Sequence, residues 1–461
     1  MDYDVVIIGA GLSGLAAGIR LAYFDKRVCI LERHQVCGGL NSFYKLAGRQ
    51  FDVGLHAVTN YVPPQVRSAP LPKLLRQLRL ARDDFALCPQ RRSEVRFGDR
   101  RLRFSNDVGL LTQEVAEVFP AQIDRFRKLL AAIDEYDYPA LGAPPGPTRQ
   151  VLGRCLSDPL LIDMLRCPVM YYGCAQEQDM DFGQFVTLFK SIYLEGLARP
   201  YGGVRVILQA LVKKLRACGG RLRTRCGVRR IETDGRRATG LLLDSGETVT
   251  AGVVLSSAGY LETMQLCSDL ATAPPAGQAG RLSFMESISC LDTTPAELGL
   301  EATIVFFNDT EKFIYARPEE PVDTRSGVIC CPNNFQGHDD LSEGVIRVTS
   351  LANYERWVEL DEEAYAAAKL EWYRRTVDRA VSFVPEFRPR VVFKDIFTPR
   401  TIERYTGHIN GAVYGAPAKV RDGRTRLKNL YICGTDQGFL GIVGAMLSGI
   451  SMVNLHVFSE G

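Results

Sequence analysis

The chain has 461 residues, of which 46% are hydrophobic and 24% are charged, and its formal net charge at pH 7 is +3. This length exceeds the size at which one hydrophobic core keeps growing, so we expect about two or three domains. The small net charge argues against a nucleic-acid partner. The 13 cysteines include no CxxC pair and no histidine cluster at zinc-ligand spacing, which predicts reduced thiols, no metal site and a cytoplasmic location.

The N-terminal residues predict a nucleotide-binding turn that follows an apolar strand at residues 4–8. The turn consists of Gly9, Ala10, Gly11, Leu12, Ser13 and Gly14. Gly9 permits the tight turn, Gly11 lets the backbone approach a pyrophosphate, and Gly14 allows close packing of helix on strand. A helix that begins near Leu12 would point its first amides at the phosphates.

A second apolar strand, residues 28–31, ends on an acidic residue, Glu32. Glu32 follows Gly14 by 18 residues, the spacing at which a carboxylate accepts hydrogen bonds from the ribose hydroxyls of an adenosine. The same carboxylate would repel a 2′-phosphate, so NADP is disfavoured at this site. We include the adjacent Arg33 in the predicted cofactor site.

Two further motifs follow. The first contains Gly38, Gly39, Leu40 and Asn41. The second runs from Phe51 to His56 as Phe-Asp-Val-Gly-Leu-His. Together with the first glycine turn, they resemble the flavin-dependent amine oxidase and phytoene desaturase superfamily. The form of the second motif is similar to the branch that holds carotenoid desaturases, carotenoid isomerases and retinol saturases, and this resemblance implies FAD as the cofactor.

The resemblance also extends to later segments. It implies that the backbone of Val228 contacts the adenine. A closing motif would hold the ribityl chain, the phosphates and the pyrimidine edge of FAD, and in this chain it comprises Gly434, Asp436, Gly441, Ile442 and Val443. Thr435 is inserted between the glycine and the acid, so whether Thr435 or Asp436 contacts the ribityl hydroxyls stays open.

The predicted fold class is α/β, with a discontinuous Rossmann-like FAD-binding domain and an inserted α+β substrate-binding domain. The FAD-binding domain would comprise residues 1–60, 200–290 and 395–461, and the substrate domain residues 61–199 and 291–394. We expect two short strands at 221–224 and 228–231. Alternating apolar residues at 303–307 and 327–330 predict sheet, the periodicity of 362–383 predicts a helix, and the proline-rich residues 139–147 predict a loop.

By resemblance, the substrate is a long apolar polyene or isoprenoid, and the favoured reaction is desaturation with hydride transfer to the flavin. Saturation, isomerisation, amine oxidation and a non-redox prenyl carrier like the GDP-dissociation inhibitors are the alternatives. His56 is the first candidate for moving a proton, because the pKa range of histidine suits acid–base catalysis. A histidine that only makes a hydrogen bond beneath the flavin is the other interpretation, and Tyr414 is the second candidate.

Two segments bear on lipid contacts. Leucines and cations alternate at helical spacing over residues 71–80, which indicates either a peripheral membrane contact or a surface helix whose leucines face the core. The aromatic stretch 182–197 would either line a substrate tunnel or form an ordinary buried helix. No targeting segment is visible, and no stretch reaches the roughly 20 apolar residues of a membrane span. The oligomeric state stays open.

Overall fold

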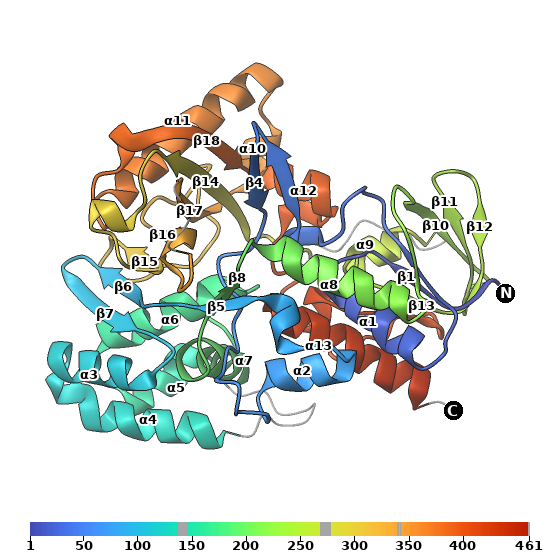
Figure 1. Ribbon diagram of the computed structural model, residues 1–461, viewed down its shortest axis with the longest axis horizontal. Coiled ribbons are helices and arrows are strands. Elements are labelled where there is room, and N and C mark those ends of the chain that lie inside the picture. The colour runs from blue at the N-terminus through green and yellow to red at the C-terminus, as the bar shows by residue number, and fades with distance from the viewer. Residues whose placement is uncertain (137–145, 268–277, 339–340, 342, 460–461) are drawn as a thin grey trace.

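The computed structural model describes residues 1–136, 146–267, 278–338, 341 and 343–459, and two large sheets organise it (Figure 1). One sheet has five strands in the order β19-β13-β1-β2-β9, and the other has seven in the order β18-β14-β17-β16-β15-β6-β7. The predicted α/β class is confirmed. The proline-rich segment predicted as a loop lies, up to residue 145, outside the described residues.

The five-stranded sheet is entirely parallel. Its strands are β1 (Tyr3–Ile8), β2 (Val28–Leu31), β9 (Arg221–Arg223), β13 (Ala251–Ser256) and β19 (Leu430–Ile432). Segments from the start, middle and end of the chain therefore meet in one sheet. Both faces of a parallel sheet are usually covered, which explains why β2 is apolar and buried along its whole length.

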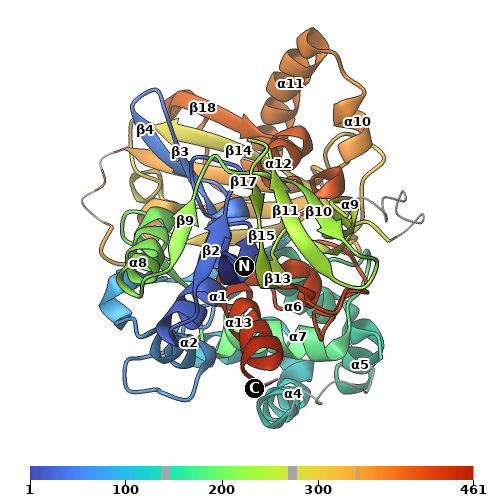
Figure 2. The same ribbon diagram turned by 90° about the vertical axis from the view of Figure 1, so that its right-hand side faces the viewer.

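Different layers cover the two faces of this sheet. Helices α1 (Leu12–Tyr23), α8 (Val204–Ala217) and α13 (Gly441–Val453) pack on the face that carries Val5 and Ile7. The other face packs against a small antiparallel sheet, which lies nearest the viewer in Figure 2. Its strands are β10 (Val228–Thr233), β11 (Ala238–Leu243) and β12 (Thr248–Val249).

The strands expected at 221–224 and 228–231 form, but in different sheets. The first, β9, pairs with β2 at the edge of the parallel sheet, while the second, β10, pairs with β11. The physical reason is that the turn between them crosses the sheet edge, where the backbone amide of Cys226 donates to the carbonyl of Glu32 at 2.8 Å.

The seven-stranded sheet is mostly antiparallel. Its strands are β6 (Ser93–Phe97), β7 (Arg100–Phe104), β14 (Ser283–Leu291), β15 (Ile304–Asn308), β16 (Ser326–Cys330), β17 (Gly344–Ala352) and β18 (Val391–Phe397). The sheet predicted at 303–307 and 327–330 is thus confirmed as the pair β15 and β16. Strand β14 runs across the domain boundary predicted at residue 290.

Helices cover both faces of this second sheet. Helix α11 (Glu362–Ala380) packs on one face through Trp372, Tyr373 and Val377, which confirms most of the helix predicted at 362–383. The helices on the other face are α3 (Val108–Val118), α4 (Ile123–Glu135), α5 (Thr148–Cys155), α6 (Pro159–Gly173) and α7 (Phe182–Phe189). Figure 1 shows this helical layer beneath the sheet.

The remaining elements are short. They are α2 (Pro70–Leu78), α9 (Tyr260–Gln265), α10 (Tyr354–Val358), α12 (Pro399–Thr406), β3 (Phe43–Leu46), β4 (Arg49–Asp52), β5 (Leu87–Pro89) and β8 (Ala198–Pro200). The leucines of α2 face the core, as one of the two interpretations of residues 71–80 expects. Helix α7 continues into a π-helical turn, Lys190–Leu194. The aromatic side chains of the stretch 182–197 are mostly buried in these two elements.

The stretch Gly441–Phe458, which is α13 with its π-helical end, has 18 residues and a mean hydropathy of 1.6, enough to cross a membrane by length and composition. Half of this stretch is buried inside the protein. A Cβ atom at Gly449 would lie only 2.0 Å from the carbonyl oxygen of Ser13, so α13 and α1 touch backbone to backbone. These contacts are those of a core helix.

Candidate functional site

The turn after β1 combines tight packing with one open position. Gly9 has a φ of +92°, and a Cβ atom at Gly14 would lie 2.2 Å from the carbonyl oxygen of Gly9, so both positions require glycine for packing. Gly11 differs, because nothing lies within 4 Å of where its Cβ atom would be. The backbone of Gly11 therefore borders open space.

Helix α1 begins directly at this turn with free amides. Its N-cap is Gly11, which offers no side-chain hydrogen bond, and its first turn holds no acidic residue. Leu12 and Ser13 are buried and anchor the start of the helix. The first amides of a helix carry partial positive charge and suit a phosphate.

Glu32 lies beside the glycine turn and is 7% exposed. One carboxylate oxygen accepts from the amide of Ala10 and the other from the amide of His34, each at 2.8 Å. A carboxylate has about four acceptor positions, so Glu32 keeps capacity for ribose hydroxyls. Arg33 is exposed and donates to the carbonyl of Arg404 at 3.3 Å.

The second glycine motif faces the first. The amide of Gly38 donates to the carbonyl of Ala10 at 2.9 Å. Gly39 has a φ of +58°, and only the Cα of Gly11, at 3.8 Å, lies near its Cβ position. Leu40 and Asn41 complete the short helical turn Gly39–Asn41. Two stretches of bare backbone therefore border the same space.

The C-terminal motif reaches the same region. A Cβ atom at Gly434 would lie 3.1 Å from Ser13 Oγ, in the first turn of α1. Helix α13 starts at Gly441 without a side-chain cap, and nothing lies within 4 Å of the Cβ position of Gly441. Ile442 and Val443 are buried in the core behind it. This is a second uncapped helix start beside open space.

The side chain of Asp436 holds two loops together, a role that the motif around it did not predict. It is 3% exposed, and its two carboxylate oxygens accept from the amides of Tyr260 and Ala416, both at 2.7 Å. The aspartate thus fixes two loops around the turn. The neighbouring Thr435 is less buried. Thr435 and Asp436 therefore both remain candidates for the residue that contacts a ribityl chain.

Val228 starts β10 and pairs with Leu243. A Cβ atom on the preceding residue, Gly227, would lie 3.2 Å from the Cβ of Arg33. The structure therefore places Val228 near the end of β2, beside Glu32. Bare glycine backbone, uncapped helix starts and a buried carboxylate together fit a bound dinucleotide such as FAD.

His56 lies in a buried charged network between the two sheets. Its Nε2 atom is 3.0 Å from Thr349 Oγ1 and 3.8 Å from a carboxylate oxygen of Glu286. Arg347 forms an ion pair with Glu286 and donates to the carbonyl of Leu55 at 2.8 Å. Thr349 and Arg347 lie on β17, and Glu286 on β14.

A second arginine holds the same loop from the other side. Arg199, on β8, forms an ion pair with Asp52 and donates to the carbonyls of Leu55 at 2.7 Å and His56 at 2.9 Å. Asp52 also accepts from the amide of Val204 at 3.0 Å, at the start of α8. The backbone of residues 52–56 is therefore held by two buried guanidinium groups.

Burial and charge set the ionisation of this network. Burial lowers the pKa of His56 below its usual value, and the raising effect of Glu286 does not compensate fully. For Glu286, burial would raise the pKa, but the Arg347 guanidinium and His56 outweigh it and lower the pKa below its usual value. The neutral imidazole and the ionised carboxylate are the favoured forms.

Tyr414, the second predicted candidate for moving a proton, lies beside Lys419, which the sequence analysis did not identify. Its hydroxyl donates to the backbone carbonyl of Tyr171. Lys419 Nζ donates to the carbonyl of Tyr414 at 2.6 Å. Burial lowers the pKa of Lys419 to about 8, against the raising effect of Asp436. Nothing in the sequence singles out this lysine, because it belongs to no motif.

A large apolar core lies next to His56 and contains an aromatic cluster. The aromatic cluster comprises Tyr171, Phe185, Phe189, Tyr193, Phe284, Phe306, Phe313 and Tyr315. Ala57 belongs to the same core, and Tyr414 packs against it. The hydroxyl of Tyr193 is buried without a hydrogen-bond partner among the described residues. Strand β14 connects the two regions, because it contributes Glu286 to the polar network at His56 and Phe284 to the apolar core.

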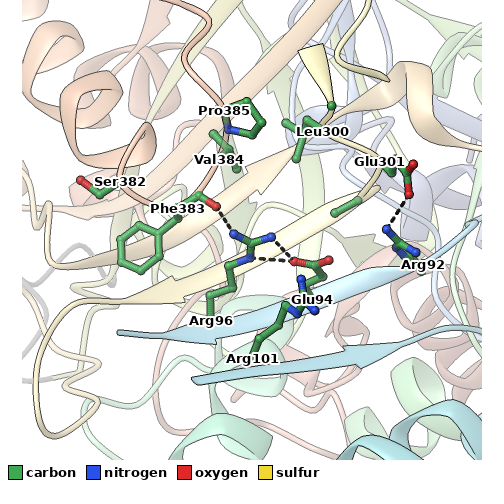
Figure 3. A pocket seen from close by; sticks show the side chains of 12 residues that line it. Arg92, Glu94, Arg96, Arg101, Leu300, Glu301, Ser382, Phe383, Val384 and Pro385 are labelled. Carbon is green, nitrogen blue, oxygen red and sulfur yellow. Dashed lines mark hydrogen bonds and ion pairs between the residues drawn. The ribbon is translucent and has the colours of Figure 1, made fainter. Parts of the chain in front are cut away.

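A polar pocket of about 380 Å³ lies elsewhere, between β6 and the loop after α11 (Figure 3). Arg96 pairs with Glu94 in its wall, and Arg92 pairs with Glu301. None of the predicted cofactor residues lines this pocket. Within the described ranges, no group of three or more histidine, cysteine or acidic side chains could hold a metal ion.

Comparisons of the sequence point to one group of proteins. Residues 7–69 match the NAD(P)-binding Rossmann-like domain. The chain is 24% identical to all-trans-retinol 13,14-reductase of Danio rerio, over 100% of this chain and 87% of the relative. It is 21% identical to prolycopene isomerase 2 of an Oncidium hybrid (97% and 83%) and 22% identical to 4,4′-diaponeurosporene oxygenase of Staphylococcus aureus (91% and 89%).

Solved structures with the same fold include oxidoreductases and a Rab GDI. An oxidoreductase from Methanosarcina mazei has a TM-score of 0.68 at 16% identity, covering 98% of this chain and 99% of that chain. Cyclohexylamine oxidase from Brevibacterium oxydans has a TM-score of 0.64 at 15% identity, covering both chains completely. Rab GDI from Plasmodium falciparum has a TM-score of 0.57 at 12% identity, covering 98% and 97%. The resemblance inferred from the sequence is therefore confirmed: the chain is similar over its whole length to the retinol saturase and carotenoid isomerase group, within the flavin amine oxidase fold.

Proposed function

We propose that the protein is an FAD-dependent oxidoreductase that acts on a long apolar polyene or isoprenoid, with desaturation of a carbon–carbon bond as the favoured reaction. The observation that carries the cofactor assignment is the bare backbone of Gly11 and Gly39, which borders open space at the uncapped start of α1. The relatives named for retinol, prolycopene and diaponeurosporene support the substrate class.

The residues proposed to hold FAD follow from this placement. Amides at the start of α1 would bind the pyrophosphate, Glu32 the ribose of the adenosine, and the start of α13 the flavin side. The full proposed set is Gly9, Gly11, Leu12, Ser13, Gly14, Glu32, Arg33, Gly38, Gly39, Leu40, Asn41, Val228, Gly434, Asp436, Gly441, Ile442 and Val443. The domain boundaries remain a proposal of the same kind.

The chain's own residues suit an apolar reaction. When bound, FAD would accept a hydride from a substrate C–H bond. The apolar core around Phe284 would bind the hydrocarbon and exclude water. His56, neutral because burial lowers its pKa, can accept a proton, and Thr349 and Glu286 orient its ring. Lys419, with a pKa of about 8, is a second group able to release or take up a proton near neutral pH.

The test is product analysis with the FAD-loaded protein. Polyenes of increasing unsaturation are incubated with oxidised protein and, separately, with reduced protein, and the products are separated by chromatography. New double bonds formed by the oxidised protein support the proposal. New single bonds, or geometric isomers without a change in mass, would assign the reaction as saturation or isomerisation instead. Turnover of simple amines alone would overturn the polyene assignment.

A cytoplasmic location and an apolar small-molecule substrate belong to the same proposal. The alternative from another class is a prenyl carrier, which the Rab GDI fold keeps open. A carrier would bind an isoprenoid chain with no change in absorbance and would have no requirement for FAD. Measuring isoprenoid binding with and without FAD therefore separates the two functions.

A further inference from the structure

A basic pocket of about 350 Å³ lies where α2 meets the C-terminal end of α1. Five residues line it: Arg20, Lys73, Arg76, Gln77 and Arg79. Four of these side chains are cations, and none of the five is acidic. Helix α2 contacts both α1 and α13, and Figures 1 and 2 both show these helices side by side.

The sequence of α2 dictates this concentration of charge. Leu71, Leu74, Leu75 and Leu78 are between 0 and 4% exposed and face the core. Helical spacing therefore places Lys73 and Arg76 on the opposite face, where both are exposed. Arg79 caps the end of the helix with a φ of +53° and is also exposed. Arg20, in the last turn of α1, adds a cation from the neighbouring helix.

Within the described part of the chain, none of the four cations forms an ion pair with a carboxylate. Glu195 interacts with the charge of Lys73, but the hydrogen bond to its carboxylate comes from Asn60 at 2.7 Å. Arg20 donates to Asn454 Oδ1 at 3.1 Å, and Arg76 donates to the carbonyl of Arg67 at 2.9 Å. Burial and the nearby charge of Arg79 lower the pKa of Arg20 below its usual value, so the cations repel one another. An anion in the pocket would relieve this repulsion.

Exposed aromatic rings border the pocket. Tyr23 and Phe24 are 38% and 46% exposed. The guanidinium of Arg79 lies 5.1 Å from the ring of Tyr23, and that of Arg20 lies 4.6 Å from the ring of Phe24. The half-buried Phe458 extends this edge, with its ring 5.0 Å from that of Phe24. Cations beside exposed aromatic rings are typical of proteins that lie at the membrane–water interface.

We propose that this pocket binds the phosphate headgroup of an anionic phospholipid and thereby attaches the protein to a membrane surface. The cations would contact the phosphate, while Tyr23, Phe24 and Phe458 would lie at the level of the headgroups. A free phosphate ion would explain the cations but leave the exposed rings unexplained. The proposal does not depend on the flavin chemistry, and its test does not use it.

The test is flotation of the full-length protein with vesicles of phosphatidylcholine alone or mixed with phosphatidylglycerol. The wild type should float only with the anionic vesicles, and raising the salt concentration should release it. The triple variant Lys73→Gln, Arg76→Gln, Arg79→Gln should bind these vesicles on the order of a hundred-fold more weakly, because each cation near an anionic surface contributes about 1 kcal/mol.

A matched variant controls for net charge. Arg229→Gln, Arg236→Gln and Lys312→Gln removes one lysine and two arginines that are exposed elsewhere, and it should float like the wild type. Equal loss in both triple variants would overturn the pocket as the site, as would salt-independent flotation of the wild type. Stabilisation by inorganic phosphate without any flotation would assign the pocket to a free anion and overturn the lipid proposal.

Discussion

The Nε2 atom of His56 lies 3.8 Å from a carboxylate oxygen of Glu286, which is itself paired with Arg347. This relationship joins a loop that follows β4 to β14 and β17 of the second sheet. Glu286 and Arg347 are buried and the His56 side chain is only 15% exposed, so their charges are strongly coupled. The network therefore sets the ionisation of the candidate catalytic histidine, and removing one of its charges would leave another charge buried without its partner.

Glu286→Gln should strongly destabilise the protein. The substitution leaves Arg347 as a buried charge without its carboxylate, and loss of one partner of a buried ion pair costs about 3–5 kcal/mol. Urea unfolding followed by fluorescence measures the change in free energy. Glu301→Gln removes a carboxylate from the exposed pair with Arg92 and should cost less than about 1 kcal/mol. Similar losses in both variants would show that the buried network is not a stabilising unit.

The stability of the wild type should fall as the pH drops below about 6.5, the usual pKa of histidine. Because the pKa of His56 is lowered in the folded state, the unfolded chain binds a proton in this range that the folded protein does not. The contribution of His56 is thus present above pH 6.5 and is lost at up to about 1.4 kcal/mol per pH unit toward the folded pKa. His56→Gln should flatten the unfolding free energy between pH 7 and 5. An unchanged slope would contradict the lowered pKa.

Gly11→Ala should weaken FAD binding without weakening the fold. Gly11 has a φ of −67°, which alanine adopts freely, and its Cβ would point into the space proposed for the pyrophosphate. Gly14→Ala should instead destabilise the protein, because its Cβ would lie 2.2 Å from the carbonyl oxygen of Gly9. FAD titration and thermal unfolding separate the two effects.

A third glycine gives the control for these variants. Gly153 lies exposed in α5 with open space around its Cβ position. Gly153→Ala should leave FAD affinity unchanged and slightly increase stability, by up to about 1 kcal/mol, since alanine favours helix more than glycine does. Normal FAD affinity in Gly11→Ala would remove the first turn from the cofactor site.

Glu32→Ala should lower FAD affinity by about ten- to a hundred-fold, because a hydrogen bond to a charged group contributes about 1.5–3 kcal/mol. The variant also removes the acceptor for the amides of Ala10 and His34. Glu32→Gln retains a carbonyl acceptor and should lie between alanine and the wild type. Equilibrium titration of the apoprotein with FAD checks this order, and equal affinity in all three proteins would contradict the proposed ribose contact.

Lys419→Met should stabilise the protein at pH 7. The folded pKa of Lys419 is about 8, below the usual value of about 10.4, so at pH 7 folding must bury a charge. Relative to a neutral lysine, this costs up to about 3 kcal/mol, and the hydrogen bond that a neutral lysine would make to Tyr414 contributes only about 1 kcal/mol. The advantage of the variant should shrink between pH 8 and 10, where the wild-type lysine folds neutral. Unfolding free energies at pH 7 and 9.5 test this difference.

Local motifs allowed much of the cofactor region to be predicted. Gly9, Gly11 and Gly14 belong to a turn of only a few residues, so their spacing in the sequence is enough to predict the geometry of that turn. The roles of Glu286, Arg347 and Lys419 could not be predicted in this way. Their partners lie up to hundreds of residues away in the chain, and only the pairing of β14 with β17 brings Glu286 and Arg347 to His56.

The same reason explains two particular differences. The strands at 221–224 and 228–231 were expected as a pair, but β9 pairs with β2 and β10 pairs with β11, so they lie in two different sheets. The choice between Thr435 and Asp436 as the ribityl contact was left open, and the structure adds that the carboxylate oxygens of Asp436 accept hydrogen bonds from the amides of two distant loops. Tertiary hydrogen bonding decided both outcomes, and the sequence near these residues holds no sign of it.

The most direct test of the proposed function is the visible absorption spectrum of the purified protein, recorded anaerobically before and after addition of a polyene substrate. If the protein is an FAD-dependent oxidoreductase of polyenes, it will show the spectrum of a bound flavin, release FAD on heating, and lose the flavin band as the substrate is oxidised. A colourless protein that fails to bind added FAD, while still binding an isoprenoid, would contradict the proposed function and indicate a lipid carrier.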